Sequence, residues 1–295
     1  MANTDLSFSN IVKGLEVNEM AWLMDELMLF SPEKRYVIVF TARSGSSWLT
    51  NVLSETKQLG FPEEYLNPNF IRGVATAVNS VVPEEFLAGL QRRRQSPNGV
   101  FGIEARELDI EAFGADCFFK IFDHNTIFFN LWRDNLVAQA VSLFRAVETQ
   151  QFHIKQGEKT AAPPLYNTKG IGKWMLQLAM QENANLKMLQ HRERPFINLC
   201  YEQMVSNRKQ TLRIFAHALD VELTTETLPG QAERSLVKIG DDWNDEMEQR
   251  FRNEAEVLVA KVEANRKIKS YIAGRANGEL IASEAPVVMP LRMAG

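Results

Sequence analysis

Residues 36–50 constrain the fold of this chain more than any other segment, and they read YVIVFTARSGSSWLT. The apolar run at 36–40 predicts a short buried strand, and the small polar residues that follow it predict a tight turn. We expect a helix to begin near Ser46, because an apolar face follows at helical spacing, formed by Trp48, Leu49, Val52 and Leu53. The chain therefore contains at least one strand–turn–helix unit.

Such a unit is typical of an anion-binding site. The turn directs backbone N–H groups and the positive end of a helix at one point. Arg43 adds a permanent positive charge, and Ser44, Ser46 and Ser47 add hydroxyl donors. The residues alone leave two interpretations open: a site for a phosphate or sulfate group, or an ordinary turn in which a serine caps the helix.

Composition narrows the class of protein. The chain has 295 residues, of which 45% are hydrophobic and 24% charged, enough for one large α/β domain or two small ones. A net charge of −4 provides no basic field that would attract nucleic acid or acidic lipid. No apolar run approaches the ~20 residues of a membrane span, and no signal peptide is visible.

The two cysteines indicate a reducing compartment. Cys117 and Cys200 both lie in apolar segments that resemble strands, and disulfide or zinc frameworks need more cysteines. We therefore expect two buried free thiols in a cytoplasmic protein. No cluster of histidine, cysteine and aspartate suggests a metal site.

A second strand–turn–helix unit occupies residues 126–147. Its apolar strand ends in Arg133 and Asp134, and Asp134 or Asn135 can cap the helix that follows. Arg133 at the end of the strand and Ser142 on the helix are candidates to face a second anion. The alternative is that Ser142 is a small packing residue and Arg133 a surface charge.

The remaining pattern predicts a central parallel sheet flanked by helices, that is, an α/β fold. Further strands are expected at 100–103, 117–121 and 195–201, and helices at 15–30, 82–95, 174–192, 207–219 and 242–264. Residues 148–169 have the composition of a mobile loop or lid. Both charged turns should lie at the carboxyl ends of strands, where α/β sheets bind ligands.

A candidate general base lies in the loop at 58–68. Glu63 and Glu64 are adjacent carboxylates among aromatic side chains, which can desolvate one of them and raise its pKa. The alternative is that both are solvated surface acids.

These motifs together resemble a known family. Residues 41–49 are similar to the phosphosulfate-binding turn of sulfotransferases that use 3′-phosphoadenosine 5′-phosphosulfate (PAPS). Four blocks, at 43–47, 62–65, 98–102 and 133–142, follow the order of the bacterial trehalose 2-sulfotransferase group, which related lipopolysaccharide and Nod-factor sulfotransferases share. A weaker fifth block lies at 234–243. The resemblance implies a P-loop-like sulfotransferase fold.

The resemblance also implies roles for particular residues. The turn that would hold the 5′-phosphosulfate comprises Arg43, Ser44, Gly45, Ser46, Ser47 and Trp48. Arg133 and Ser142 match the pair that binds the 3′-phosphate, and Arg234 matches a basic position of the cofactor segment. Glu64 matches the general base, and Arg43 would stabilise charge on the leaving 3′-phosphoadenosine 5′-phosphate (PAP).

One position departs from the family pattern. Glu104 stands where the family usually carries a lysine, and Arg106 and Lys120 are candidates to supply the missing charge. This reversal bears on the substrate and on activity.

The function expected from the resemblance is transfer of a sulfuryl group from PAPS to an acceptor hydroxyl, on a carbohydrate, glycolipid or other small molecule. One alternative is a P-loop kinase or NTPase, although that loop needs Gly-x-x-x-x-Gly-Lys-Ser/Thr and this turn has a single glycine and no following lysine. Another is a catalytically idle nucleotide-binding protein.

The expected domain organisation has three parts. We expect an N-terminal helical extension at 1–34, a sulfotransferase domain at 35–265 and a C-terminal tail at 266–295. The apolar face of the N-terminal helix makes a homodimer possible.

Overall fold

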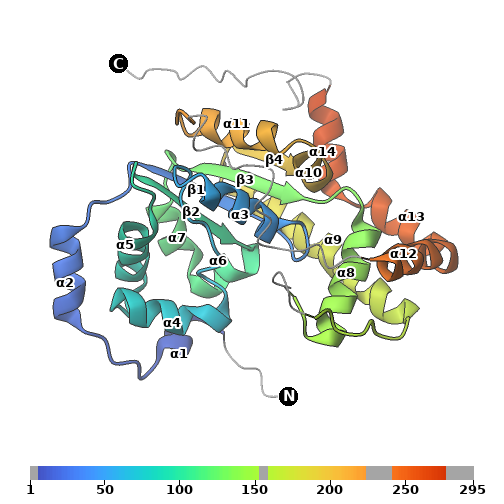
Figure 1. Ribbon diagram of the computed structural model, residues 1–295, viewed down its shortest axis with the longest axis horizontal. Helices are drawn as coiled ribbons and strands as arrows, with labels where there is room; N and C mark the ends of the chain where they lie inside the picture. The colour runs from blue at the N-terminus through green and yellow to red at the C-terminus, as the bar shows by residue number, and fades with distance from the viewer. Residues whose placement is uncertain (1–5, 153–158, 224–240, 277–295) are drawn as a thin grey trace.

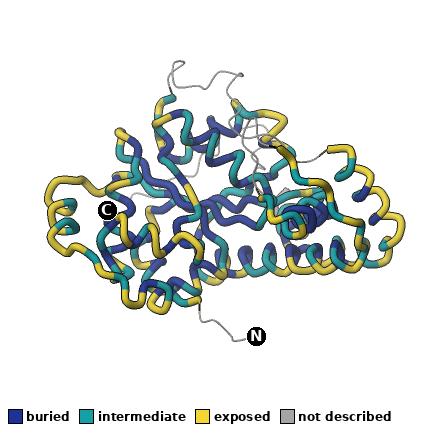
Figure 2. Tube along the Cα trace, turned by 60° about the horizontal axis from the view of Figure 1, so that its bottom comes forward, coloured by how far each residue is buried: buried dark blue, intermediate teal, exposed yellow. Residues whose placement is uncertain are grey.

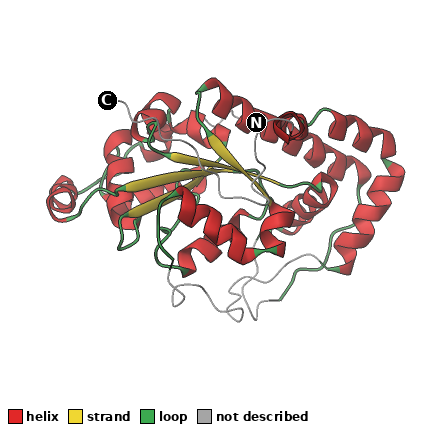
Figure 3. Ribbon diagram, turned by 90° about the horizontal axis from the view of Figure 1, so that it is seen from above, coloured by secondary structure: helices red, strands yellow, loops and turns green. Residues whose placement is uncertain are grey.

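A four-stranded parallel sheet forms the centre of the molecule (Figures 1 and 3). The computed structural model describes residues 6–152, 159–223 and 241–276. The strands are β1 (Lys34–Val39), β2 (Val100–Ala105), β3 (Ile127–Trp132) and β4 (Phe196–Cys200), in the spatial order β2-β1-β3-β4. The predicted α/β fold with a parallel sheet flanked by helices is confirmed.

Helices fill the connections between and after the strands, and Figure 1 labels them. Their bounds are α1 Phe8–Val12, α2 Glu19–Met28, α3 Ser46–Glu55, α4 Pro68–Val78, α5 Pro83–Arg94, α6 Glu107–Phe113, α7 Ala115–Ile121, α8 Leu136–Thr149, α9 Thr168–His191, α10 Tyr201–Ser206, α11 Arg208–Ala218, α12 Asp242–Glu254, α13 Glu256–Ala264 and α14 Lys267–Ala276.

The sheet is buried because helices cover both of its faces. Successive side chains of a strand point to opposite faces, so β1 divides its apolar residues between two cores. Val37 and Val39 pack with residues of α4 to α7, whereas Tyr36 and Ile38 pack with residues of α3 and α11. Figure 2 shows the strands as mostly buried segments in the middle of the molecule.

A third core lies beyond the edge of the sheet, where α8, α9 and α12 pack together (Figure 1). Apolar residues of α8 and α9 meet Met247 and Phe251 of α12 there. This core fixes the helix that carries Ser142 and ties the C-terminal helices to it.

The order of the strands defines where a ligand can bind. The chain passes from β1 to β2 on one side, and then places β3 on the opposite side of β1. In open α/β sheets the crevice at such a reversal, outside the carboxyl ends of the strands, is the usual ligand site. The turns after β1 and β3, which carry Arg43 and Arg133, flank this crevice.

One predicted strand is wrong. Residues 117–121 lie in α7, where Phe118 and Phe119 are buried in the core and Cys117 is half-buried. A short, wholly apolar run has no periodicity that separates a strand from a buried helix, and the structure resolves the ambiguity as a helix.

The predicted helix at 242–264 is two helices, which meet at Ala255. Residues 267–276 form α14, although the sequence predicted a tail from 266.

The N-terminal segment contacts the sheet domain through two helices, α1 and α2. Phe8 of α1 is buried, with its ring 5.1 Å from Phe86 and 4.9 Å from Phe113. No residue of α2 is buried, and that helix joins α5 through the Asp25–Arg93 and Glu26–Arg92 ion pairs. The domain boundaries and the homodimer stay predictions.

Candidate active site

The turn after β1 is built to expose backbone N–H groups. Gly45 is the N-cap of α3, with a φ of 91° in the left-handed region, and no side chain caps the helix. The first N–H groups of α3 thus lack partners within the helix. The alternative that a serine caps this helix is wrong. Arg43 also has a left-handed backbone, with a φ of 62°, a strained conformation that clusters at functional sites.

Side chains from the helices hold the turn in place. Gln139 of α8 donates to Thr41 Oγ1 at 2.9 Å and to the Ala42 carbonyl at 2.7 Å. The Ser44 hydroxyl donates to the Thr41 carbonyl at 2.7 Å and is fully buried. Ser44 therefore uses its O–H group inside the turn. Ser46 is buried, Ser47 is half-buried, and Trp48 packs at the edge of the α3 core.

The structure brings Arg43, Arg133 and Ser142 together, although 99 residues separate Arg43 from Ser142. Arg43 Nε donates to Ser142 Oγ at 3.0 Å, and Arg133 Nη1 donates to the Arg43 carbonyl at 3.4 Å. Ser142 keeps its own O–H group available as a donor while it accepts from Arg43. The two charged turns thus form one site.

The electrostatics of this site favour an anion. Burial, and then the charge of Arg133, lower the pKa of the Arg43 guanidinium. Within the described ranges no carboxylate pairs with Arg43. Arg133 Nε is buried and lies 3.4 Å from Glu202 Oε1, but it makes no hydrogen bond to any described residue. Of the two neighbouring guanidinium groups only Arg133 lies beside a carboxylate, so the pair leaves positive charge that an anionic ligand would neutralise.

Tyr201 and Glu202 are site residues that the sequence analysis missed. The Tyr201 ring lies under the Arg133 guanidinium at 4.7 Å, and Glu202 accepts from the backbone N–H of Asp134 at 2.9 Å. Burial raises the pKa of Glu202, but hydrogen bonds from the amides of Asp134 and its neighbours outweigh burial and lower it overall. Their position directly after β4, at the same edge of the sheet, is the signal that could have found them.

Arg266 stabilises the turn after β3, which carries Arg133. It is fully buried and donates to the Arg133 carbonyl at 2.6 Å and to the Asp134 carbonyl at 2.8 Å. Glu182 of α9 balances its charge, with the Arg266 Nη2 to Glu182 Oε2 distance at 2.7 Å. The turn that carries Arg133 is therefore fixed by a residue that the sequence analysis assigned to a tail.

Glu64 and Glu63 have different surroundings. Glu63 is exposed and pairs with Arg94 at 2.6 Å, whereas Glu64 is half-buried and accepts from Asn67 Nδ2 at 2.9 Å. The backbone N–H of Glu104 donates to the Glu63 carbonyl at 3.1 Å, which fastens this loop to β2. Of the two carboxylates, Glu64 is the one that faces inward.

Glu104 is buried beside the turn. Its side chain hydrogen-bonds with Ser46, and its Oε1 atom has no partner among the described residues. Arg106 is held by Asp109 through two contacts of 2.7 Å, and Lys120 is exposed on α7. Neither residue forms an ion pair with Glu104, and their contribution to the charge of the site stays a prediction.

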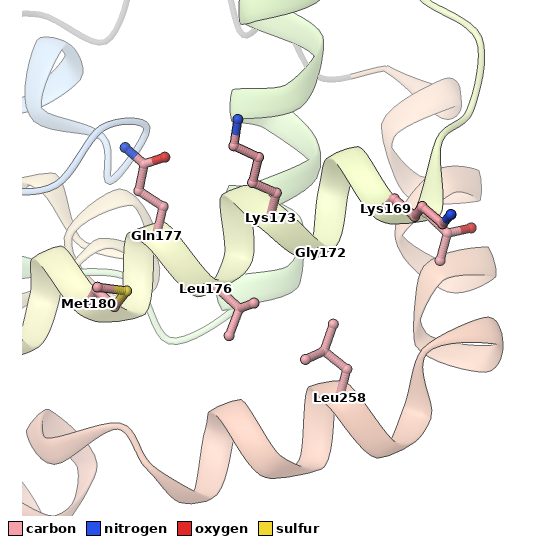
Figure 4. Close-up of a pocket in the computed structure, with 8 residues that line it drawn as sticks. Lys169, Gly172, Lys173, Leu176, Gln177, Met180 and Leu258 are labelled. Atoms are coloured by element: carbon pink, nitrogen blue, oxygen red, sulfur yellow. The ribbon is translucent and has the colours of Figure 1, made fainter.

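Some candidate features lie elsewhere. Arg234 falls outside the described residues, so its role in cofactor binding stays a prediction. A pocket of about 640 Å³ lies between α9 and Leu258 of α13 and contains none of the candidate site residues (Figure 4).

The described segments hold no group of three His, Cys, Asp or Glu side chains that could bind a metal ion. They also contain no helix that is both long enough and apolar enough to cross a membrane.

Fold and site together define an α/β protein with an uncapped, arginine-bearing turn at the switch point of its sheet. The Stf0 sulphotransferase family model matches residues 114–254, a segment that includes Arg133 and Ser142. This match supports the resemblance of the sequence motifs to a sulfotransferase family.

Other comparisons are more remote. The sulfotransferase domain of the olefin synthase of Synechococcus PCC 7002 aligns with a TM-score of 0.45 and 14% identity, over 75% of this chain and 88% of that chain. No curated protein matches the chain.

Proposed function

We propose that this chain transfers a sulfuryl group from PAPS to an acceptor hydroxyl. The observation that carries the proposal is the convergence of Arg43, Arg133 and Ser142 beside the uncapped N-terminus of α3. PAPS carries two phosphate groups and a sulfate, and paired arginines with free backbone amides are the donors that such oxyanions prefer.

The residues divide between the two ends of the donor. The N–H groups at the start of α3, with Arg43, Ser46 and Ser47, would hold the 5′-phosphosulfate. Arg133 and the free O–H group of Ser142 would hold the 3′-phosphate. The hydrogen bond from Arg43 to Ser142 links the two subsites, so the site binds both groups as one unit.

Glu64 is proposed as the general base. In the transfer, a bond forms from the acceptor oxygen to sulfur, the bond from sulfur to the bridging oxygen breaks, and the acceptor proton passes to the Glu64 carboxylate. The hydrogen bond from Asn67 to Glu64 Oε2 fixes the orientation of that carboxylate. Arg43 and the turn amides stabilise the charge that grows on the leaving oxygen.

The proposed acceptor is a hydroxyl of a carbohydrate or glycolipid, on the strength of the family resemblance alone. Incubation of the protein with PAPS and pooled glycans, followed by mass spectrometry, would identify it through the mass gain of one sulfate group.

The role of Glu64 can be tested by transfer from labelled PAPS. We expect Glu64→Gln to lower the transfer rate roughly 10²–10⁴-fold, the range for loss of a general base, with PAP binding retained. Glu63→Gln is the matched control, because its carboxylate is exposed and pairs with Arg94. Unchanged transfer by Glu64→Gln would remove Glu64 as the base.

A further inference from the structure

Glu104 is an acidic residue in a buried position, where an ionised side chain is energetically unfavourable. It pairs with Ile38 in the register of β1 and β2, so its side chain lies on the sheet face that α3 covers. It is 4% exposed, and its Oε1 atom has no hydrogen-bond partner in the described chain. An unpaired buried carboxylate is costly, so this residue requires an explanation.

The groups around Glu104 provide no compensating cation. The Ser46 hydroxyl approaches it from α3, and the carboxylates of Glu63 and Glu64 on the loop add like charge near it. The nearest arginines are already engaged, since Arg94 pairs with Glu63 and Arg106 with Asp109. No Lys or Arg of the described chain forms an ion pair with Glu104.

These surroundings favour the protonated form of Glu104. Burial first, and then the like charge of Glu64, raise its pKa well above the ordinary value, while the hydrogen bond with Ser46 only partly opposes them. The protonated acid is neutral and carries an O–H donor, and no described residue bonds to its Oε1 atom.

We propose that Glu104 binds the donor substrate as a protonated carboxylic acid. It acts as a neutral hydrogen-bond donor beside Ser46, at the position where the family pattern that the sequence resembles has a lysine. This inference rests on the proposed function. Ionised Glu104 would repel the phosphosulfate, so binding and protonation of Glu104 are coupled.

The coupling predicts proton uptake. Calorimetric titration of the full chain with PAP, in pairs of buffers with different ionisation enthalpies, counts the protons bound with the ligand. At pH values near and above the raised pKa of Glu104, where the free protein has lost this proton, the wild type should take up as much as about one proton more than Glu104→Gln, whose amide mimics the neutral acid. PAP's own titration is the same for both proteins and cancels in the comparison. PAP affinity should fall with rising pH in the wild type and less so in Glu104→Gln.

A second variant separates this role from a structural one. Glu64→Gln removes the like charge beside Glu104, which should lower the pKa of Glu104. The pH range in which PAP binding takes up a proton should therefore lie lower in Glu64→Gln than in the wild type. This comparison stands even if Glu104→Gln does not fold. Equal proton uptake in the wild type and Glu104→Gln, or no shift in Glu64→Gln, would overturn the inference while PAP still binds. Absence of PAP binding to all three proteins would instead overturn the proposed function, and the inference with it.

Discussion

Gly45 illustrates how one residue determines the site. Its left-handed backbone directs the first N–H groups of α3 outward, and a Cβ atom there would collide with the Tyr201 ring. The sequence shows a glycine in the turn. Its contact with Tyr201 joins residues that are far apart in the chain, so no local sequence pattern predicts it.

Gly45→Ala should therefore weaken PAP binding and destabilise the fold. Left-handed backbone at a non-glycine residue costs about 1–2 kcal/mol, and displacement of Tyr201 adds to that cost. Gly14→Ala is the matched control, because Gly14 also has a positive φ of 70° and its Cβ would meet nothing within 4 Å. Urea denaturation and PAP calorimetry measure both effects. Equal destabilisation by the two variants would contradict the role of the Tyr201 contact.

Glu104 makes a prediction about stability as a function of pH. Its pKa in the folded chain is raised, so the stability that it contributes is complete below the unfolded pKa of ~4.3 and is lost as pH rises toward the folded value. Glu104→Gln should be more stable than the wild type at neutral pH, and the difference should vanish in acid.

Urea denaturation at several pH values checks this. Glu148→Gln on the exposed side of α8 is the control, and it should change stability little at any pH. A difference between Glu104→Gln and the wild type that does not vary with pH would contradict a protonated Glu104.

At the scale of elements, the sequence predicts all four strands of the sheet and one further strand that the structure does not contain. β1 and β3 are confirmed because each ends in a charged turn before a capped or amphipathic helix. The run at 117–121 was predicted as a strand and is part of α7, since burial on all sides removes the periodicity that would identify a helix.

Arg266 connects elements that are distant in the sequence. Arg266 lies between α13 and α14 and connects Glu182 of α9 to the turn after β3. Arg266→Met should cost about 3–5 kcal/mol, because it leaves Glu182 buried and unpaired. The variant should also weaken PAP binding through Arg133.

Arg192→Met is the comparison for that measurement. The Arg192–Asp116 pair is exposed, with Asp116 at 94%, so its loss should cost ~1 kcal/mol or less. Chemical denaturation of both variants provides the numbers, and similar costs would show that Arg266 does not brace the turn.

At the scale of the whole molecule, the reversal of strand order between β1 and β3 creates the site. The alternation of strands and helices was sufficient to predict a parallel sheet and ligand binding at its carboxyl edge. It was not sufficient to predict that Arg43 contacts Ser142 or that Tyr201 and Glu202 complete the surroundings of Arg133, because these contacts depend on the order of strands in space.

The most direct test of the account is a calorimetric comparison of PAP with ATP and Mg²⁺ on the full chain. We expect PAP to bind more tightly, and Arg133→Met to weaken PAP binding about 10–100-fold, the loss of a charge-assisted contact. Arg213→Met, which removes an exposed arginine of α11, should leave the affinity unchanged. Tighter binding of ATP with Mg²⁺ than of PAP, or equal PAP affinity in Arg133→Met and the wild type, would contradict a site built for PAPS.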